Sequence, residues 1–126
     1  MTNDQKAKFK FWWDEENKII RYDQFQDLKI DGKVAQEITD GVNQIIKDHP
    51  QAGLLVNIAV QKSIPSSQAR HTLGQLIAQF GSVKVAFINK NTALRVAVDF
   101  ILHAAGSQNS SMFSDEQEAL KWLKEK

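Results

Sequence analysis

Alternating hydrophobic and polar positions predict two strands at the start of the chain. Residues 8–13 alternate, so that aromatic side chains share one face of a strand while Trp12 shares the other face with Lys8 and Lys10. Residues 18–25 alternate in the same way, and the connection at 14–17 is short and polar. Two strands joined so closely predict an antiparallel hairpin. The aromatic face of the first strand consists of Phe9, Phe11 and Trp13.

Helical periodicity and apolar runs then alternate along the middle of the chain. Apolar positions recur every three or four residues from a cap candidate at Asp31 to about Asp48, which predicts a helix with one buried stripe. The nearly continuous apolar run Gly53–Gln61 predicts a strand in the middle of a sheet that is covered on both faces. A second helix opens at Pro65-Ser66-Ser67 and ends near Gly81, and a strand follows at Val83–Ile88. Strand, helix and strand in this order predict a parallel βαβ unit.

A third helix, from Thr92 to about Ala105 after a cap at Asn91, is apolar over an unusually wide arc. That arc spans about 240°, more than a helix with one buried face needs. Val96 and Phe100 therefore require a cover other than the sheet, namely a neighbouring helix, a second copy of the chain or an apolar ligand. The narrow polar arc of this helix consists of Arg95, Asp99 and His103.

The end of the chain predicts a very short apolar segment and a last helix. Met112-Phe113 is the apolar segment, and Ser114 to Gln117 has the spacing of a capping box with Ser114 as the cap. The element order is ββαβαβα(β)α, which predicts an α/β fold with about four helices on a mixed sheet. We expect residues 1–7 to form a flexible tail and residues 8–126 to form a single domain.

Composition narrows the function classes. The 126 residues are 42% hydrophobic and 25% charged, with a formal net charge of +1 and no cysteine. A charge so close to zero argues against nucleic-acid binding by bulk charge, and the lack of cysteine excludes disulfides and thiol chemistry. The chain has no run of eighteen apolar residues, so no membrane span is predicted. No apolar leader follows Met1, and we therefore expect a cytoplasmic protein.

Candidate chemistry is sparse. His49, His71 and His103 fall on different elements without metal-binding spacing, and no phosphate-binding loop or nucleophile motif is present. We therefore expect no catalytic residue, no metal and no cofactor. Trp12 beside lysines has two interpretations, a platform for single-stranded nucleic acid or a side chain buried by a helix or a neighbouring subunit, and the small net charge favours the second. An enzyme stays an alternative only because His71 lies near Ser66 and Ser67 on one helix.

Two segments resemble a known family. Asn57–Ser67, an apolar strand with one polar residue followed by a loop and a serine pair at a helix start, resembles the core segment of STAS domains. Met112–Leu123, with its Trp-Leu close, is similar to the ending of stand-alone SpoIIAA-like proteins, a STAS/SEC14-like group. The resemblance spans about Lys8 to Leu123 and implies a SpoIIAA-like (STAS) single α/β domain, with an N-terminal antiparallel hairpin and parallel βαβ units in a mixed sheet.

The resemblance implies a non-enzymatic regulatory module that binds another protein. In anti-sigma factor antagonists a kinase phosphorylates the serine at the helix start, and the added charge disrupts partner docking. Ser66 occupies that position and Ser67 follows it, although a plain helix cap explains either serine equally well. The chain departs from the family at three positions. It has Pro65 in place of Asp, Gln68 in place of Gly, and Asn57 in place of the acidic residue of the strand.

Two partner hypotheses follow. In the first, the Ser63–Arg70 segment and the third helix form a face that docks a protein partner or a second copy, as in a homodimer. In the second, from the SEC14-like side of the resemblance, the domain carries or senses a lipid or another small apolar molecule, with Trp12, Val96 and Phe100 near the pocket. A carrier of this kind predicts an enclosed apolar cavity on the order of several hundred Å³.

Overall fold

The structure, a computed structural model, describes residues 8–106 and 109–125, so the predicted tail at 1–7 lies outside the described residues. Its five strands form one sheet in the order β1-β2-β3-β4-β5, in which β1 and β2 are antiparallel and all other neighbours are parallel. The strands are β1 (Phe9–Asp14), β2 (Ile19–Gln24), β3 (Gly53–Asn57), β4 (Val85–Ile88) and β5 (Ser110–Phe113). The helices are α1 (Gly32–Ile46), α2 (Ser67–Ala78), α3 (Thr92–Ala104) and α4 (Glu116–Lys124). This confirms the predicted mixed α/β sheet, its hairpin and its element order.

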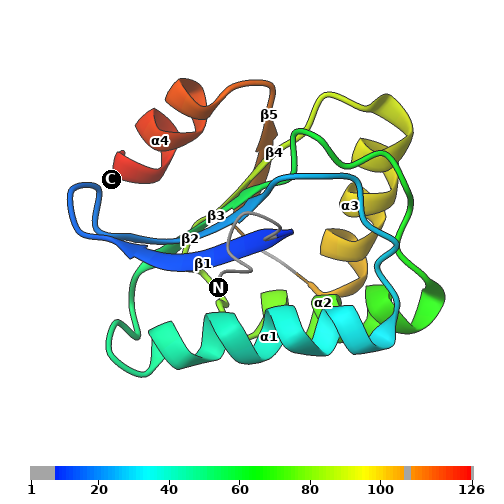
Figure 1. Cartoon of the computed structure of the whole chain (residues 1–126). Helices are drawn as coiled ribbons and strands as arrows, with labels where there is room; N and C mark the ends of the chain where they lie inside the picture. The colour runs from blue at the N-terminus through cyan, green and yellow to red at the C-terminus, as the bar shows by residue number, and fades with distance from the viewer. Residues whose placement is uncertain (1–7, 107–108, 126) are drawn as a thin grey trace, which may run out of the picture.

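The sheet is covered on both faces, but unequally. Helices α1, α2 and α3 pack on one face around Ile20, Leu54 and Val85. Helix α4 lies alone on the opposite face, as Figure 1 shows, and packs its Ala119 against Leu55. The strands thus bury opposite faces with alternate residues, as their sequence pattern predicts. In the described ranges no helix is long and apolar enough to cross a membrane.

The aromatic face of β1 packs against α1. The rings of Phe9 and Phe11 lie 5.2 Å apart, and both contact Tyr22 of β2 at about the same spacing. Trp13 stacks on His49, just after α1, with ring centroids 3.5 Å apart. The predicted core face of β1 is confirmed, and the stacked pair fixes the end of α1 against the edge of the sheet.

Two element boundaries differ from the prediction for local reasons. Strand β3 ends at Asn57 rather than at Gln61, because the Asn57 side chain accepts a hydrogen bond from the backbone N–H of Ala59 and turns the chain. The cap of α4 is Asp115 rather than Ser114, since Asp115 Oδ1 accepts from the N–H of Glu118 at 2.9 Å. Both residues at 114 and 115 are good caps, and only one of them can lie at the helix start. The caps expected at Asp31 and Asn91 are confirmed.

Two glycines inside helices differ in the space around them. A Cβ at Gly41 of α1 would come within 2.6 Å of the Phe11 ring, so this glycine lets α1 approach β1 closely. A Cβ at Gly74 of α2 would meet Ile101 of α3 at 3.8 Å, which is ordinary contact distance. Gly41 therefore marks a close approach between a helix and the sheet, whereas the space beside Gly74 would accept a Cβ.

We expect Gly41→Ala and Gly74→Ala to change stability in opposite directions. Both substitutions gain about 0.5–1 kcal/mol from helix propensity. Gly41→Ala also overpacks the Phe11 ring, which costs about 1–3 kcal/mol, so its net effect is destabilising. Urea unfolding of both variants measures the difference, and a stabilised Gly41→Ala would contradict the close approach of α1 to β1.

Candidate functional site

The loops that follow β2 and β3 are held together by two polar side chains. Gln61 is 1% exposed, and its amide donates to the carbonyl oxygens of Leu28 at 2.8 Å and Ser63 at 2.6 Å. Asp27 accepts from the backbone N–H groups of Lys62 and Ser63, each at 2.9 Å. These bonds, the one from the Ser63 backbone first, hold the pKa of the Asp27 carboxyl below its usual value. The loop that leads to Ser66 and Ser67 is therefore tied to the loop after β2 through both Gln61 and Asp27.

Asn89 ties the loop after β4 to the same edge of the sheet. It is fully buried, and its amide donates to the Ile58 carbonyl oxygen at 2.6 Å. Its own Oδ1 accepts from the N–H of Asn91, the cap of α3, at 2.7 Å. The starts of α2 and α3 are thus positioned by buried amide side chains at the carboxyl ends of β2, β3 and β4.

The serine pair lies at the start of α2. Ser66 is the helix cap, and its Oγ accepts from the N–H of Ala69 at 3.1 Å, while its own N–H donates to Ile30. Both Ser66 and Ser67 are exposed. One turn further on, Arg70 donates to the Pro65 carbonyl oxygen at 2.6 Å. The structure therefore confirms a capping role for Ser66 rather than Ser67.

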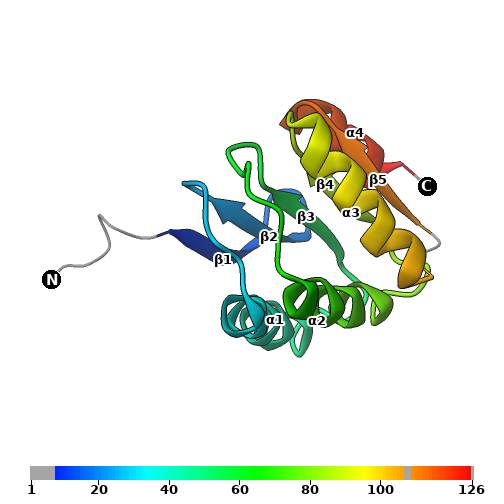
Figure 2. The same cartoon turned by 90° about the vertical axis from the view of Figure 1, so that its right-hand side faces the viewer.

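A groove of about 360 Å³ runs between α2 and α3, which lie side by side (Figure 2). It brings Arg70, the last residue of the predicted docking segment, together with Phe100 of the third helix. Phe100 is 73% exposed and Val96, one turn before it, is 66% exposed. No neighbouring helix of the described chain covers them. The groove is lined by Arg70, His71, Gly74, Gln75, Ala78, Phe100, Ile101, Ala104 and Ala105.

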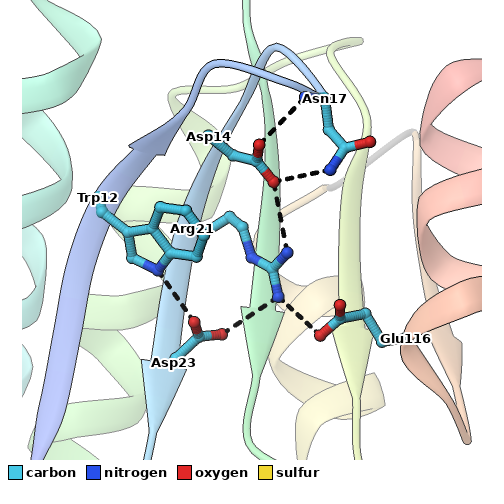
Figure 3. A network of polar contacts seen from close by, with 6 residues as sticks. All are labelled: Trp12, Asp14, Asn17, Arg21, Asp23 and Glu116. Carbon is cyan, nitrogen blue, oxygen red and sulfur yellow. Dashed lines mark hydrogen bonds and ion pairs between the residues drawn. The ribbon is translucent and has the colours of Figure 1, made fainter.

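Trp12 lies elsewhere, on the α4 face of the sheet. Figure 3 shows its indole beside Arg21, with Nε1 donating to Asp23 Oδ2 at 2.9 Å. The charged groups of Arg21 and Lys10 lie 5.0 Å and 4.9 Å from the ring centroid. The ring is half-buried, and its partners come from its own hairpin. The structure therefore brings Trp12 into a polar cluster and separates it from Val96 and Phe100, with which the sequence grouped it.

Arg21 is the centre of this cluster and is only 6% exposed. Its guanidinium donates to Glu116 Oε1 of α4 at 2.7 Å and to Asp14 Oδ2 at 3.4 Å, and it forms an ion pair with Asp23 at 3.5 Å (Figure 3). Burial opposes the charge of Arg21 and is the largest single effect, but the bond to Glu116, the charges of Asp23 and Glu116 and the bond to Asp14 together outweigh it, so the pKa of Arg21 is raised. Burial likewise raises the pKa of Asp14, yet hydrogen bonds from Asn17 and the charge of Arg21 bring it below its usual value.

A narrow apolar cavity of about 80 Å³ lies between the sheet and the layer of α1, α2 and α3. At one end Tyr22 donates to Gln24 at 2.8 Å, and burial raises the pKa of the Tyr22 hydroxyl. Gln24 in turn donates to Gln61, which joins the cavity to the anchored loops. Neither Trp12, Val96 nor Phe100 lines this cavity.

The remaining titratable groups do not converge. His71 lines the groove, yet no hydrogen bond links it to Ser66 or Ser67 in the described residues. Within residues 8–106 and 109–125 no three His, Asp or Glu side chains could together hold a metal ion. The features that the described residues offer for binding are the α2–α3 groove and the apolar cavity.

Several residues that organise the site gave no separate signal in the sequence. Gln61 and Asn89 each follow an apolar run, a position that predicts a loop but not a buried tie between loops. Arg21 appeared as one of the alternating residues of a strand, and its partner Glu116 lies 95 positions away. The one available signal was that a charged residue, Arg21, alternates onto the face of its strand while Trp12 does the same on the neighbouring strand.

Replacing Ser66 should weaken the fold more than replacing Ser67. Ser66→Ala removes the cap of α2 and should lower the free energy of unfolding by about 1 kcal/mol. Ser67→Ala is the matched control and should change it by less than about 0.5 kcal/mol, because its side chain is exposed at the first helical position. Urea unfolding checks both, and equal losses would contradict the capping geometry.

Comparison with known proteins places the chain in a family. The model of the family described as "Domain of unknown function (DUF7793)" matches residues 11–126. A comparison with curated proteins gives no match. Among solved structures, the chain is similar to an uncharacterized protein of the DUF3478 family with a SpoIIAA-like fold from Shewanella loihica PV-4, with a TM-score of 0.65, 15% identity and 91% of each chain covered. At that identity the likeness shows the fold, which confirms the SpoIIAA-like resemblance predicted from Asn57–Ser67 and Met112–Leu123. The chain has a SpoIIAA-like fold and belongs to the DUF7793 family of domains of unknown function.

Proposed function

We propose that this domain is a non-enzymatic regulatory module that docks a protein partner on α3 and the adjoining α2–α3 groove. The observation that carries the proposal is the exposure of Val96 and Phe100, 66% and 73%, on successive turns of α3. Large apolar side chains exposed together, beside a groove, are typical of protein-binding surfaces.

The groove has the composition of a docking site for side chains. Small residues of both helices, Gly74 and Ala78 from α2 and Ala104 from α3, line it and leave room for a partner. Arg70 and His71 supply a polar edge on the α2 side. An apolar centre with a polar rim is the usual anatomy of an interface between proteins.

The position of Ser66 supports a regulatory role. The serine is exposed, lies at the helix start that STAS domains use, and precedes the groove residue Arg70 by one turn. A phosphate on Ser66 would add about −1.5 to −2 charges at pH 7. Modification would therefore change the charge at one end of the docking face without altering its apolar centre.

Photocrosslinking tests the docking face. A photoreactive benzoylphenylalanine at position 100 should give discrete crosslinked species in cells of the native host, because this side chain points away from its own core. The same residue at Gln44, exposed on α1, is the matched control and should give none. Phe100→Asp should stay folded, with a change below about 0.5 kcal/mol in the free energy of unfolding, since the side chain is exposed.

Two outcomes would contradict the docking face. The first is the absence of any crosslink from position 100, and the second is an identical pattern from positions 100 and 44. Unfolding of Phe100→Asp would show that this side chain is part of the core.

A second candidate function, carriage of a small apolar molecule, is favoured by the cavity between the sheet and the helices. Its lining is almost entirely apolar, and Tyr22 and Gln24 provide polar groups at one end. At about 80 Å³ it is smaller than the roughly 300–1,000 Å³ of sites for drug-sized ligands. A lipid would therefore have to separate α2 from the sheet, whereas a compact apolar molecule of a few atoms fits the space as it stands.

Native mass spectrometry separates the two candidates. Protein purified gently from its own host should show the mass of bare protein, alone or with a protein partner, if docking is its function. A releasable apolar molecule, lost in a Leu73→Trp variant that fills the cavity and retained in Thr72→Val on the same helix, would establish the carrier instead.

A further inference from the structure

We infer that the α2–α3 groove binds one face of an amphipathic helix of a protein partner, and that the flank of this helix along α2 is acidic. This inference rests on the proposed function and names the kind of segment that docks there. Three features of the groove support it, namely the backbone of its walls, the spacing of its lining side chains and the charges at its edge.

The walls of the groove favour a helical occupant over an extended one. Both walls are α-helices, whose backbone N–H groups and carbonyl oxygens bond to one another along each helix. An extended peptide gains affinity from main-chain hydrogen bonds to the edge of a sheet, and no strand of the described chain lines this groove. A helix pairs its own backbone groups and brings only side chains to the surface, so it suits such walls.

The lining of the groove has the spacing that the side-chain ridge of another helix requires. On both walls lining residues recur every four positions, namely Arg70, Gly74 and Ala78 on α2 and Phe100 and Ala104 on α3. Rows of this spacing form the grooves into which the ridges of a second helix pack. The small residues leave depth for apolar side chains of the partner, and the exposed Phe100 ring becomes buried against them.

The charges around the groove set the polar flank of the partner. Helix α2 contains no acidic residue, and its edge of the groove carries Arg70 and His71. Arg70 donates to the Pro65 carbonyl oxygen, but no carboxylate of the described chain pairs with its charge. Asp99, the single acidic residue of α3, lies about 100° round that helix from Phe100 and does not line the groove.

An Asp or Glu on the flank of the partner therefore meets a positive charge without a competing carboxylate, whereas a Lys or Arg there is repelled. Charge and backbone thus specify the same occupant by separate routes, since the backbone of the walls selects a helix and the edge of α2 selects its acidic flank.

Selection from a displayed library of helical peptides tests the inference. The peptides are about 20 residues long, so that helices form in solution. Their apolar stripe varies among Ala, Leu, Phe and Met, and their flanks vary among Glu, Gln and Lys. The purified full chain should enrich peptides with the stripe at helical spacing and Glu on one flank. A library of Pro-containing, extended peptides of the same length is the control and should give no binder at this groove.

Variants of the groove locate the site of binding. Phe100→Asp should weaken binding of a selected peptide by about tenfold or more because it removes the apolar contact, and Ala78→Trp should do the same because it fills the groove. Both side chains are exposed, so both variants should stay folded by circular dichroism. Gln44→Trp on α1 is the matched control and should leave the affinity, measured by fluorescence anisotropy, unchanged. Equal affinity for all three variants would overturn the groove as the binding site.

Charge exchange tests the acidic flank. Arg70→Glu should weaken the Glu-flanked peptide by about tenfold, and the same peptide with Lys in place of Glu should bind this variant better than the wild-type chain. His71→Glu, at an exposed groove residue, should act in the same direction and does not disturb the bond from Arg70 to Pro65. Lys121→Glu on α4 is the control. A wild-type chain that binds Lys-flanked peptides as tightly as Glu-flanked ones would contradict the acidic flank.

The inference and the proposed function fail in different ways. A selection that yields no groove binder, or only extended peptides, overturns the helical occupant. If position 100 still crosslinks to a protein in cells, the docking face stands and only the kind of docked segment changes. If position 100 gives no crosslink at all, both proposals fall.

Discussion

The structure depends on one constraint, which is that a largely parallel sheet has to be covered on both faces although one face has only a single short helix. Helix α4 contains nine residues. A helix is about 10 Å wide and strands are spaced by about 4.8 Å, so α4 covers two or three of the five strands. It packs on β3, β4 and β5 and meets β2 at Ile19 and Arg21, so among the described residues the same face of β1 has no helix packed on it.

Arg21 completes this uncovered part of the sheet. Its guanidinium lies over the Trp12 ring and connects the hairpin to the first turn of α4 through Glu116. Three carboxylates, those of Asp14, Asp23 and Glu116, share the one guanidinium. A buried cation of this kind is costly to leave without partners, so the cluster fixes the position of α4 relative to the hairpin more than it adds stability. Trp12 belongs to this arrangement, which explains why an aromatic residue among lysines is half-buried.

The opposite face of the sheet has three helices, so on this side part of the apolar surface of a helix is left uncovered. With α1 and α2 covering β1, β2 and β3, α3 packs on the sheet with only part of its apolar circumference, through Leu94, Val98 and Leu102. The buried amides of Gln61 and Asn89 hold the starts of α2 and α3 at the edge of the sheet. They therefore position the starts of the two helices that border the groove. Two helices anchored in this way, beside the exposed Val96 and Phe100, need little reorganisation to bind a partner, and the docking proposal uses this property.

The sequence by itself determined the elements, their order, the buried faces of the strands and most helix caps, because each of these depends on neighbours within one or two turns. The period of two in β1 and β2 placed Phe9 and Trp12 on opposite faces, and Asp31 and Asn91 had to cap the helices that follow them. The wide apolar arc of α3 likewise predicted that the sheet does not cover Val96 and Phe100, and both are exposed in the structure. Only the tertiary structure decided which residues meet across long separations. The pairing of Arg21 with Glu116, the buried tie from Gln61 to Leu28 and the groove that joins Arg70 to Phe100 arise when helices and strands pack. Local periodicity fixes the direction in which a side chain points, but packing geometry alone decides what lies there.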